Sequence, residues 1–325
     1  MRHARAVRAA SSNIATARCK NSPPGSGRES GGRTLAQAGI QTDPILVCWD
    51  LDPGLRRDTA KHAMTTPPFI PAPPEIRLGT APVRVDWTPA ERSALLDRLV
   101  AAYPDHLSGH DHQGLHWADG EIWPLPASIE AMTPAQLLDS DDVLLGFAWP
   151  YATHGVPLAD PGRTRSARFF TKVYGDCLAG AVAPRLETVR WTDGSAIRVT
   201  RTAGVAEALR RVVAALESSG PDVLDFCRDP GSAAEPAGYD CRVIAGTARR
   251  SMHAYGAAFD LNHGRTHYWQ WSDAAAGAIA PYINTVPLEI VAAFEAEGFI
   301  WGGRWAHFDT MHFEYRPELV PPAAQ

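Results

Sequence analysis

Three residues near the C-terminal end of the chain have the types and the spacing of a metal site. His253 is followed seven positions later by Asp260, and His312 lies three positions after Asp309 in the run HFDTMHFEY. Neutral imidazole and carboxylate groups are common zinc ligands, and a catalytic zinc uses three protein ligands and leaves one coordination position open. We therefore predict that His253, Asp260 and His312 bind zinc.

The carboxylate of Asp309 is better explained as a general base than as a fourth ligand. A fourth protein ligand would close the site, whereas a carboxylate beside the open position can take a proton from the attacking water. This arrangement predicts hydrolysis. Glu314 is the alternative base, and it is also a good partner for a ligand imidazole, because such ligands usually donate their other N–H to an oxygen.

The residues around these groups predict two short strands. Gly256 allows a tight turn after His253, and Phe259 and Leu261 alternate with small and polar residues. His312 and Glu314 likewise share one strand face, opposite Phe313 and Tyr315 (312–315). Two strands with ligands at their ends can converge on one ion.

The two segments SMHAYGAAFD and WGGRWAHFDTMHFEYRP resemble the zinc D-Ala-D-Ala carboxypeptidase family, which includes vancomycin-resistance dipeptidases and L-alanyl-D-glutamate endopeptidases. The family pattern is Ser-x-His-x-x-Gly-x-Ala-x-Asp, followed by Glu or Asp-x-x-His. The resemblance is strong over the last third of the chain and looser from about Asp160 onward. The HFE ending and the aspartate at the base position look more like the endopeptidase branch. The matching residues are Ser251, His253, Gly256, Ala258, Asp260, Asp309 and His312.

The resemblance implies an α+β fold, in which a small antiparallel sheet with flanking helices holds a hedgehog/DD-peptidase-like zinc site. It also implies peptidoglycan peptides, which contain D-amino acids, as substrates. The cleaved bond would be D-Ala-D-Ala in a carboxypeptidase or L-Ala-D-Glu in an endopeptidase. Two alternatives remain open: a non-catalytic zinc-containing module that binds cell-wall peptide or a protein, and hydrolysis of another amide such as a D-amino-acid dipeptide.

Amide hydrolysis also needs a cation near the oxyanion that develops at the scissile carbonyl. The family uses an arginine upstream of the first histidine, and we predict Arg242 for this role because the following residues, up to Gly246, suggest a strand and a turn. Arg249 and Arg250 remain candidates, and a purely structural Arg242 is the alternative.

Further residues are candidates for substrate binding. Guanidinium groups bind carboxylates in a bidentate manner, so one arginine of the run DPGRTRSARFF could hold the peptide. Arg163 is preferred over Arg165 and Arg168, although surface salt bridges explain these arginines equally well. Trp305 is expected to form a wall of the site, and His307 either contacts substrate, orients Asp309 or is structural. Ser251 and Tyr255 in the first motif complete the set.

Composition favours a soluble globular protein of one or two domains, with 45% hydrophobic residues among 325. A net charge of -5 implies no general affinity for nucleic acid, and no apolar run approaches the roughly 20 residues of a membrane span. Residues 1–63 are predicted to be a disordered or wrongly annotated leader, with Met64 as the alternative start. Residues 64–158 would form an N-terminal helical and loop region, and residues 159–325 the zinc peptidase domain.

Local signals predict several regular elements. Capping boxes at Thr88 and Thr133 predict a helix over 89–102 and a second short helix. Strands are expected at 186–191 and 196–200, and further helices at 205–216 and 288–297. The histidines at 106, 110, 112 and 116 are expected in a mobile polar loop rather than in a metal site.

Cysteine spacing gives no sign of a disulfide or of a thiolate zinc site. Outside the leader the chain has Cys177, Cys227 and Cys241, an odd number without Cys-x-x-Cys spacing. We predict buried free thiols. The compartment stays undecided between periplasm and cytoplasm, because neither start shows an export signal.

Overall fold

The structure, a computed structural model, describes residues 85–320 apart from 127–128, 130–131, 154–158, 229, 231–236, 245–246 and 272–280. Met1–His62 and Ala63–Gln325 form separate units, so every described residue belongs to the second. The predicted leader, 1–63, and the proposed start at Met64 lie outside the described residues.

The helices begin where the sequence signals place them. Helix α1, Pro89–Ala102, starts with a complete capping box between Thr88 and Glu91, and α2, Pro134–Leu138, starts with another between Thr133 and Gln136. Both predicted capping boxes are therefore confirmed. The remaining α-helices are α3 (Ala167–Tyr174), α4 (Val205–Glu217), α5 (Pro221–Phe226) and α6 (Leu288–Ala296).

The described strands form three small antiparallel sheets. The first has the order β1-β2-β3, with β1 Leu107–His110, β2 Leu115–Trp117 and β3 Ile122–Trp123. The predicted hairpin is β4, Leu186–Arg190, paired with β5, Ala196–Thr200. The third has the order β6-β8-β7, with β6 Ala258–Asp260, β8 His312–Tyr315 and β7 Phe299–Trp301. The predicted α+β class is confirmed.

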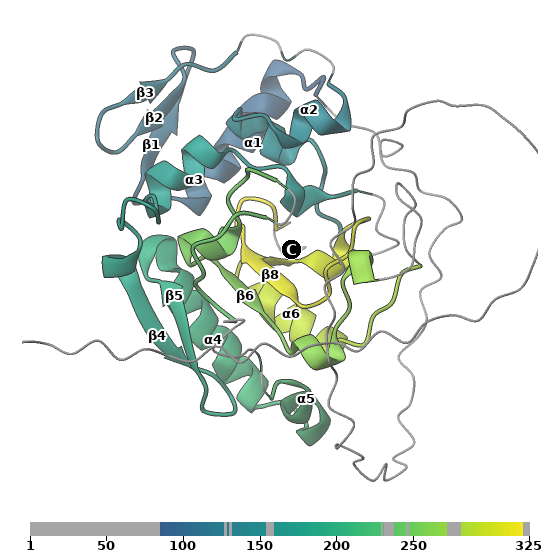
Figure 1. Ribbon diagram of the computed structural model, residues 1–325. Coiled ribbons are helices and arrows are strands. Elements are labelled where there is room, and N and C mark those ends of the chain that lie inside the picture. The colour runs from purple at the N-terminus through teal and green to yellow at the C-terminus, as the bar shows by residue number, and fades with distance from the viewer. Residues whose placement is uncertain are drawn as a thin grey trace, which may run out of the picture. The chain divides into compact units, whose positions relative to one another are not determined.

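The β6-β8-β7 sheet separates an apolar core from a polar site. Phe313 of β8 stacks on Phe294 of α6 with 4.0 Å between ring centroids, and Phe259 of β6 packs against Trp191. The neighbouring β8 residues His312 and Glu314 occupy the other face, as the alternation predicted. Figure 1 shows strands β6 and β8 together with helix α6. The sheet therefore fixes the polar residues through the rigid packing of their apolar neighbours.

The prediction of a mobile polar loop for the histidine-rich segment is wrong. Residues 107–117 form the β1–β2 hairpin, because Leu107, Leu115 and Trp117 are buried in the main hydrophobic core. The apolar residues on either side of His116 alternate with polar ones, as in a half-buried strand. The number of polar histidines in the segment hid this pattern.

The prediction of free thiols is wrong for two of the three cysteines. Cys177 and Cys241 form a disulfide with a Cα–Cα distance of 5.8 Å. Their separation of 64 residues leaves no local pattern, since tertiary packing alone brings them together. Cys227 is a buried free thiol as predicted, and burial raises its pKa to about 12.

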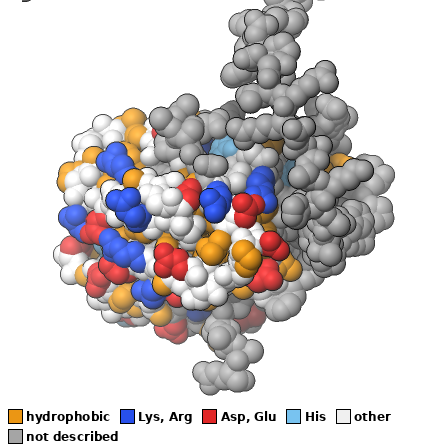
Figure 2. Space-filling model, turned by 90° about the horizontal axis from the view of Figure 1, so that it is seen from below, with side chains coloured by type: hydrophobic (Ala, Val, Ile, Leu, Met, Phe, Trp, Pro, Cys, Tyr) orange, Lys and Arg blue, Asp and Glu red, His pale blue; other side chains and the backbone are white. Residues whose placement is uncertain are grey.

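Among the described residues, no helix combines the length and the apolar character needed to cross a membrane. Figure 2 shows positive and negative side chains interspersed on the visible face, so neither sign dominates there.

Candidate metal centre

Two neighbouring strands and one short helix bring the predicted ligands together. The β6–β8 register places Asp260 opposite His312. His253 lies in a short 3-10 helix, Met252–Tyr255, which Ser251 caps and Gly256 ends with a φ of 68°. The ligand atoms of His253, Asp260 and His312 all lie within 4.8 Å of one another, and all three residues are buried. The predicted convergence of these residues is confirmed.

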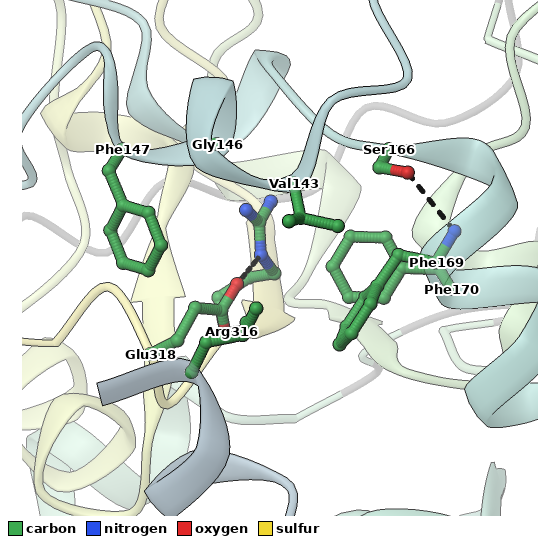
Figure 3. A pocket seen from close by; sticks show the side chains of 9 residues that line it. Val143, Gly146, Phe147, Ser166, Phe169, Phe170, Arg316 and Glu318 are labelled. Atoms are coloured by element: carbon green, nitrogen blue, oxygen red, sulfur yellow. Dashed lines mark hydrogen bonds and ion pairs between the residues drawn. The ribbon is translucent and has the colours of Figure 1, made fainter. Parts of the chain in front are cut away.

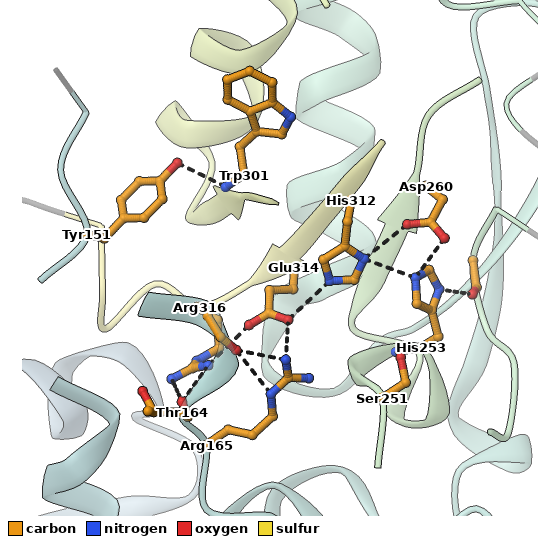
Figure 4. Close-up of polar contacts among 12 residues, drawn as sticks. Tyr151, Thr164, Arg165, Ser251, His253, Asp260, Trp301, His312, Glu314 and Arg316 are labelled. Atoms are coloured by element: carbon orange, nitrogen blue, oxygen red, sulfur yellow. Dashed lines mark hydrogen bonds and ion pairs between the residues drawn. The ribbon is translucent and has the colours of Figure 1, made fainter. Parts of the chain in front are cut away.

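Both imidazoles turn one ring nitrogen toward Asp260. His253 Nε2 lies 3.1 Å from Oδ2, and His312 Nδ1 lies 3.0 Å from Oδ1. The two ring nitrogens are 3.2 Å apart (Figure 4). The outer nitrogens are engaged elsewhere, His253 Nδ1 with the Gly238 carbonyl at 2.6 Å and His312 Nε2 with Glu314 Oε2 at 3.1 Å. Two oriented imidazoles and a carboxylate fit a zinc ion.

The electrostatics of this cluster favour positive charge. Burial alone would raise the pKa of Asp260, but the charge and hydrogen bond of His253, together with His312, hold it well below the usual value. Burial would lower the pKa of His312, but its hydrogen bonds to Asp260 and Glu314 raise it to about 10. A divalent cation competes with protons for such ligands, so a site that attracts one also attracts the other.

Asp309 lies beside the cluster with an unused acceptor. Its Oδ1 is buried and has no hydrogen-bond partner in the described part of the chain. Burial raises its pKa to about 7, with a further increase from the charge of Asp260, while His312 and Arg242 act in the opposite direction. Its backbone N–H donates to the Gly302 carbonyl at 3.0 Å, and a β-bridge joins it to Tyr268. A carboxylate held in this way suits proton transfer near neutral pH.

Sequence reasoning missed two arginines behind Glu314. Arg165 Nη2 lies 3.3 Å from Glu314 Oε2, and Arg316 Nη1 donates to Oε1 at 3.1 Å. Burial would raise the pKa of Glu314, but Arg165, the hydrogen bond from His312, and Arg316 lower it to about 2. The spacing of His312, Glu314 and Arg316 along one strand direction was the available signal for Arg316. For Arg165 the sequence suggested a carboxylate partner on a peptide or at the surface, whereas its partner in the structure is Glu314.

Arg242 lies close enough for its charge to lower the pKa of Asp309, and it pairs with Asp240 at 3.2 Å. Its neighbour Val243 forms an isolated β-bridge with Arg250, whereas Gly246 of the predicted turn lies outside the described residues. The other two candidates are engaged elsewhere: Arg249 donates to the Leu138 carbonyl at 3.2 Å, and Arg250 lies 3.5 Å from Asp176. The oxyanion role of Arg242 stays a prediction.

The predicted substrate-binding residues occupy different positions. Asp160 ties two of them together, because it lies 3.3 Å from Arg163 Nη1 and accepts from the backbone N–H of His307 at 2.8 Å. The ring of Trp305 lies 5.6 Å from that of His312. Tyr255 is a core residue whose hydroxyl pairs with that of Thr171 at 3.1 Å. Ser251 is buried and accepts from the His253 N–H. Their contacts with a substrate stay predictions.

A family model described as D-alanyl-D-alanine carboxypeptidase matches residues 245–315. The matched segment contains His253, Asp260, Asp309 and His312, and it confirms the resemblance seen in the two motifs. No curated protein matches the chain. The family match supports a peptidase, and the converging cluster makes a bound metal plausible.

Proposed function

We propose that the protein is a zinc metallopeptidase that hydrolyses a peptide bond in peptidoglycan-type peptides. The observation that carries this proposal is the buried convergence of His253, Asp260 and His312, with the unpartnered Oδ1 of Asp309 beside it. A site made only to bind zinc for stability has no need of this additional buried carboxylate.

His253 Nε2, His312 Nδ1 and the Asp260 carboxylate would hold the zinc. When bound, such an ion polarises the scissile carbonyl and lowers the pKa of a water from 15.7 to about 7. Asp309 takes the proton from the attacking water at its carboxylate and delivers it to the leaving amine. Its raised pKa suits both halves of this transfer.

Two arginines complete the proposal. Arg242 stabilises the negative charge that develops on the carbonyl oxygen, which its electrostatic influence on Asp309 supports. Arg163 binds a carboxylate of the peptide. Its side chain is 23% exposed, and its Nη1 lies 3.3 Å from Asp160 Oδ2. Trp305 and His307 would line the site, and the cleaved bond is D-Ala-D-Ala or L-Ala-D-Glu.

The test is mass spectrometry of a defined muropeptide pentapeptide incubated with the zinc-loaded protein. The wild-type chain should release a fragment whose mass identifies the bond. Asp309→Ala and Asp309→Asn should retain bound zinc and lose about 100- to 10,000-fold in turnover, the range for a general acid-base residue.

The zinc content of each variant, measured by atomic absorption, separates the possible results. Zinc retained with turnover lost supports the role of Asp309 as base. Loss of zinc from Asp309→Asn would make it a ligand instead. A wild-type protein that binds zinc and cleaves no peptide would favour the binding module.

A further inference from the structure

A series of buried charges leads away from the metal centre through Glu314. One of its oxygens, Oε2, faces both His312 Nε2 at 3.1 Å and Arg165 Nη2 at 3.3 Å, and the other accepts from Arg316. Glu314 is fully buried, and the side chains of Arg165 and Arg316 are only 7% and 2% exposed (Figure 4). Both guanidinium groups therefore act on Glu314 with little screening by solvent.

The two arginines are not equivalent. Arg316 Nε also donates to Glu318, a second buried carboxylate, which accepts from the Tyr103 hydroxyl at 2.8 Å. Arg165 pairs with Glu314 and with no other carboxylate in the described part of the chain. Arg316 is thus shared by Glu314 and Glu318, whereas Arg165 is the cation assigned to Glu314 alone. A buried carboxylate that loses such a partner is strongly destabilised.

The backbone holds Arg165 firmly in place. Its Nε and Nη2 donate to the Gly162 carbonyl at 3.1 and 2.7 Å. Gly162 leaves no room for a side chain, since a Cβ there would meet the Trp305 ring at 2.2 Å and Glu314 Oε1 at 3.0 Å. The turn at Pro161–Arg163 therefore lies directly against Glu314. It holds the Nε–Nη2 edge of the Arg165 guanidinium, and Nη2 also faces Glu314.

The far end of the series borders a small cavity. Arg316 and Glu318 line a cavity of about 10 Å³ together with Val143, Phe147 and Phe170 (Figure 3). Such a volume holds about one water molecule. The contacts of these charges lead back through Glu314 to His312 on β8.

We propose that Arg165 is a positioning residue of the metal centre. By fixing the carboxylate of Glu314, it fixes the ring of His312 with Nδ1 directed toward Asp260 and His253, and so strengthens zinc binding. Oxygen partners behind ligand histidines typically contribute 10- to 100-fold in metal affinity. The inference rests on the proposed zinc function, but it concerns metal affinity and not cleavage.

The test is the zinc dissociation constant, measured by competition with a chromogenic chelator. Arg165→Met removes the charge at similar length and should weaken zinc binding about 10- to 100-fold. Arg165→Lys keeps the positive charge, so its loss of zinc affinity should be smaller than that of Arg165→Met. Some loss should remain, because a lysine cannot contact Gly162 and Glu314 together as the guanidinium does. Glu314→Gln should weaken binding as Arg165→Met does. The double variant should bind zinc no more weakly than the single variant with the lower zinc affinity. Both changes remove the same interaction, the pair between Arg165 and Glu314.

Arg304→Met is the matched control. Arg304 forms a partly buried pair with Glu295, at 2.6 and 3.1 Å, that does not involve a ligand histidine. Zinc affinity should be unchanged in this variant, and circular dichroism should show each variant folded. If Arg165→Met does not fold, Arg165→Lys and Glu314→Gln still test the proposal.

Three results would overturn the inference. The first is wild-type zinc affinity in Arg165→Met or, if that variant does not fold, in Arg165→Lys. The second is independent effects of Arg165 and Glu314 on zinc affinity in the double variant, and the third is an equal loss of zinc affinity in Arg304→Met. A wild-type chain that binds no zinc would instead overturn the proposed function. The two failures are therefore distinguishable.

Discussion

His110 and His116 on the first sheet each lie 2.9 Å from an aspartate, close to the distances of 3.1 and 3.0 Å that join His253 and His312 to Asp260. The surroundings differ. The side chains of Asp97 and Asp111, which face the first two histidines, are 73% and 41% exposed, whereas that of Asp260 is 9% exposed.

Convergence is the second difference. Each hairpin histidine has an aspartate of its own, whereas His253 and His312 share Asp260. Among the described residues, only His253, Asp260 and His312 form such a group. The outer nitrogens of the two ligand histidines are also held by Gly238 and Glu314. Residue type and contact distance alone therefore do not define a metal site; shared geometry and a rigid second layer of contacts do.

The largest expected difference between the two regions is in zinc affinity. Removing a ligand with His312→Ala should weaken zinc binding by more than about 100-fold, because structural zinc sites bind with about 10–16 kcal/mol spread over four ligands. The combined change His110→Ala and His116→Ala should leave affinity within about twofold of wild type. Isothermal titration with zinc measures both, and equal losses would remove the distinction.

A second expected difference between the two regions is in catalysis, and it is tested at Arg242, whose charge acts on Asp309. Arg242→Met should lower kcat about 100- to 1,000-fold, as loss of an oxyanion donor does, with zinc content retained. Arg242→Lys should recover part of the rate because the charge remains. Steady-state kinetics on the cleaved muropeptide provides the measurement, and a rise in KM alone would assign Arg242 to substrate binding.

The Asp160–His307 pair tests what burial contributes to a histidine–aspartate contact outside the predicted metal ligands. Burial raises the pKa of Asp160, but the hydrogen bond from His307 and the charge of Arg163 outweigh it, so the pKa is lowered. A lowered pKa means that the ionised carboxylate stabilises the folded state above its unfolded pKa, near 3.8, and that this contribution is lost as the pH falls through the folded value.

Asp160→Asn should therefore cost about 1–3 kcal/mol in the free energy of unfolding at pH 7, the range for a hydrogen bond to a buried charge. The difference from wild type should shrink as the pH falls below 3.8. Urea unfolding at several pH values measures this, and a difference that grows at low pH would contradict the assignment.

The smallest effect is expected for a pair in which the aspartate is exposed. His110→Ala breaks the contact with Asp97 and should change the free energy of unfolding by less than about 1 kcal/mol, because exposed ion pairs contribute little. Urea unfolding in low and high salt provides the check. A cost comparable to that of Asp160→Asn would show that burial is not what separates the two regions.

Sequence reasoning succeeded where one local signal decides the outcome. Thr88 with Glu91 fixed the start of α1, and the alternation around Phe313 placed His312 and Glu314 on one strand face. It failed where distant segments decide. Leu115 and Trp117 become strand residues because the core covers them, and Arg165 is buried because Glu314 meets it across the fold. In a linear sequence such an arginine looks like a surface residue.

The disulfide between Cys177 and Cys241 makes part of the structure depend on the redox state of the compartment. Cytosolic thiols are kept reduced, whereas oxidising compartments let such bonds persist. Cys241 directly precedes Arg242 in the chain and belongs to the loop that leads to Ser251. In a reducing compartment this loop would lose its covalent link, whereas in an oxidising compartment the link would persist. The placement of Arg242, which follows Cys241 directly, would then depend on the redox state of the surroundings.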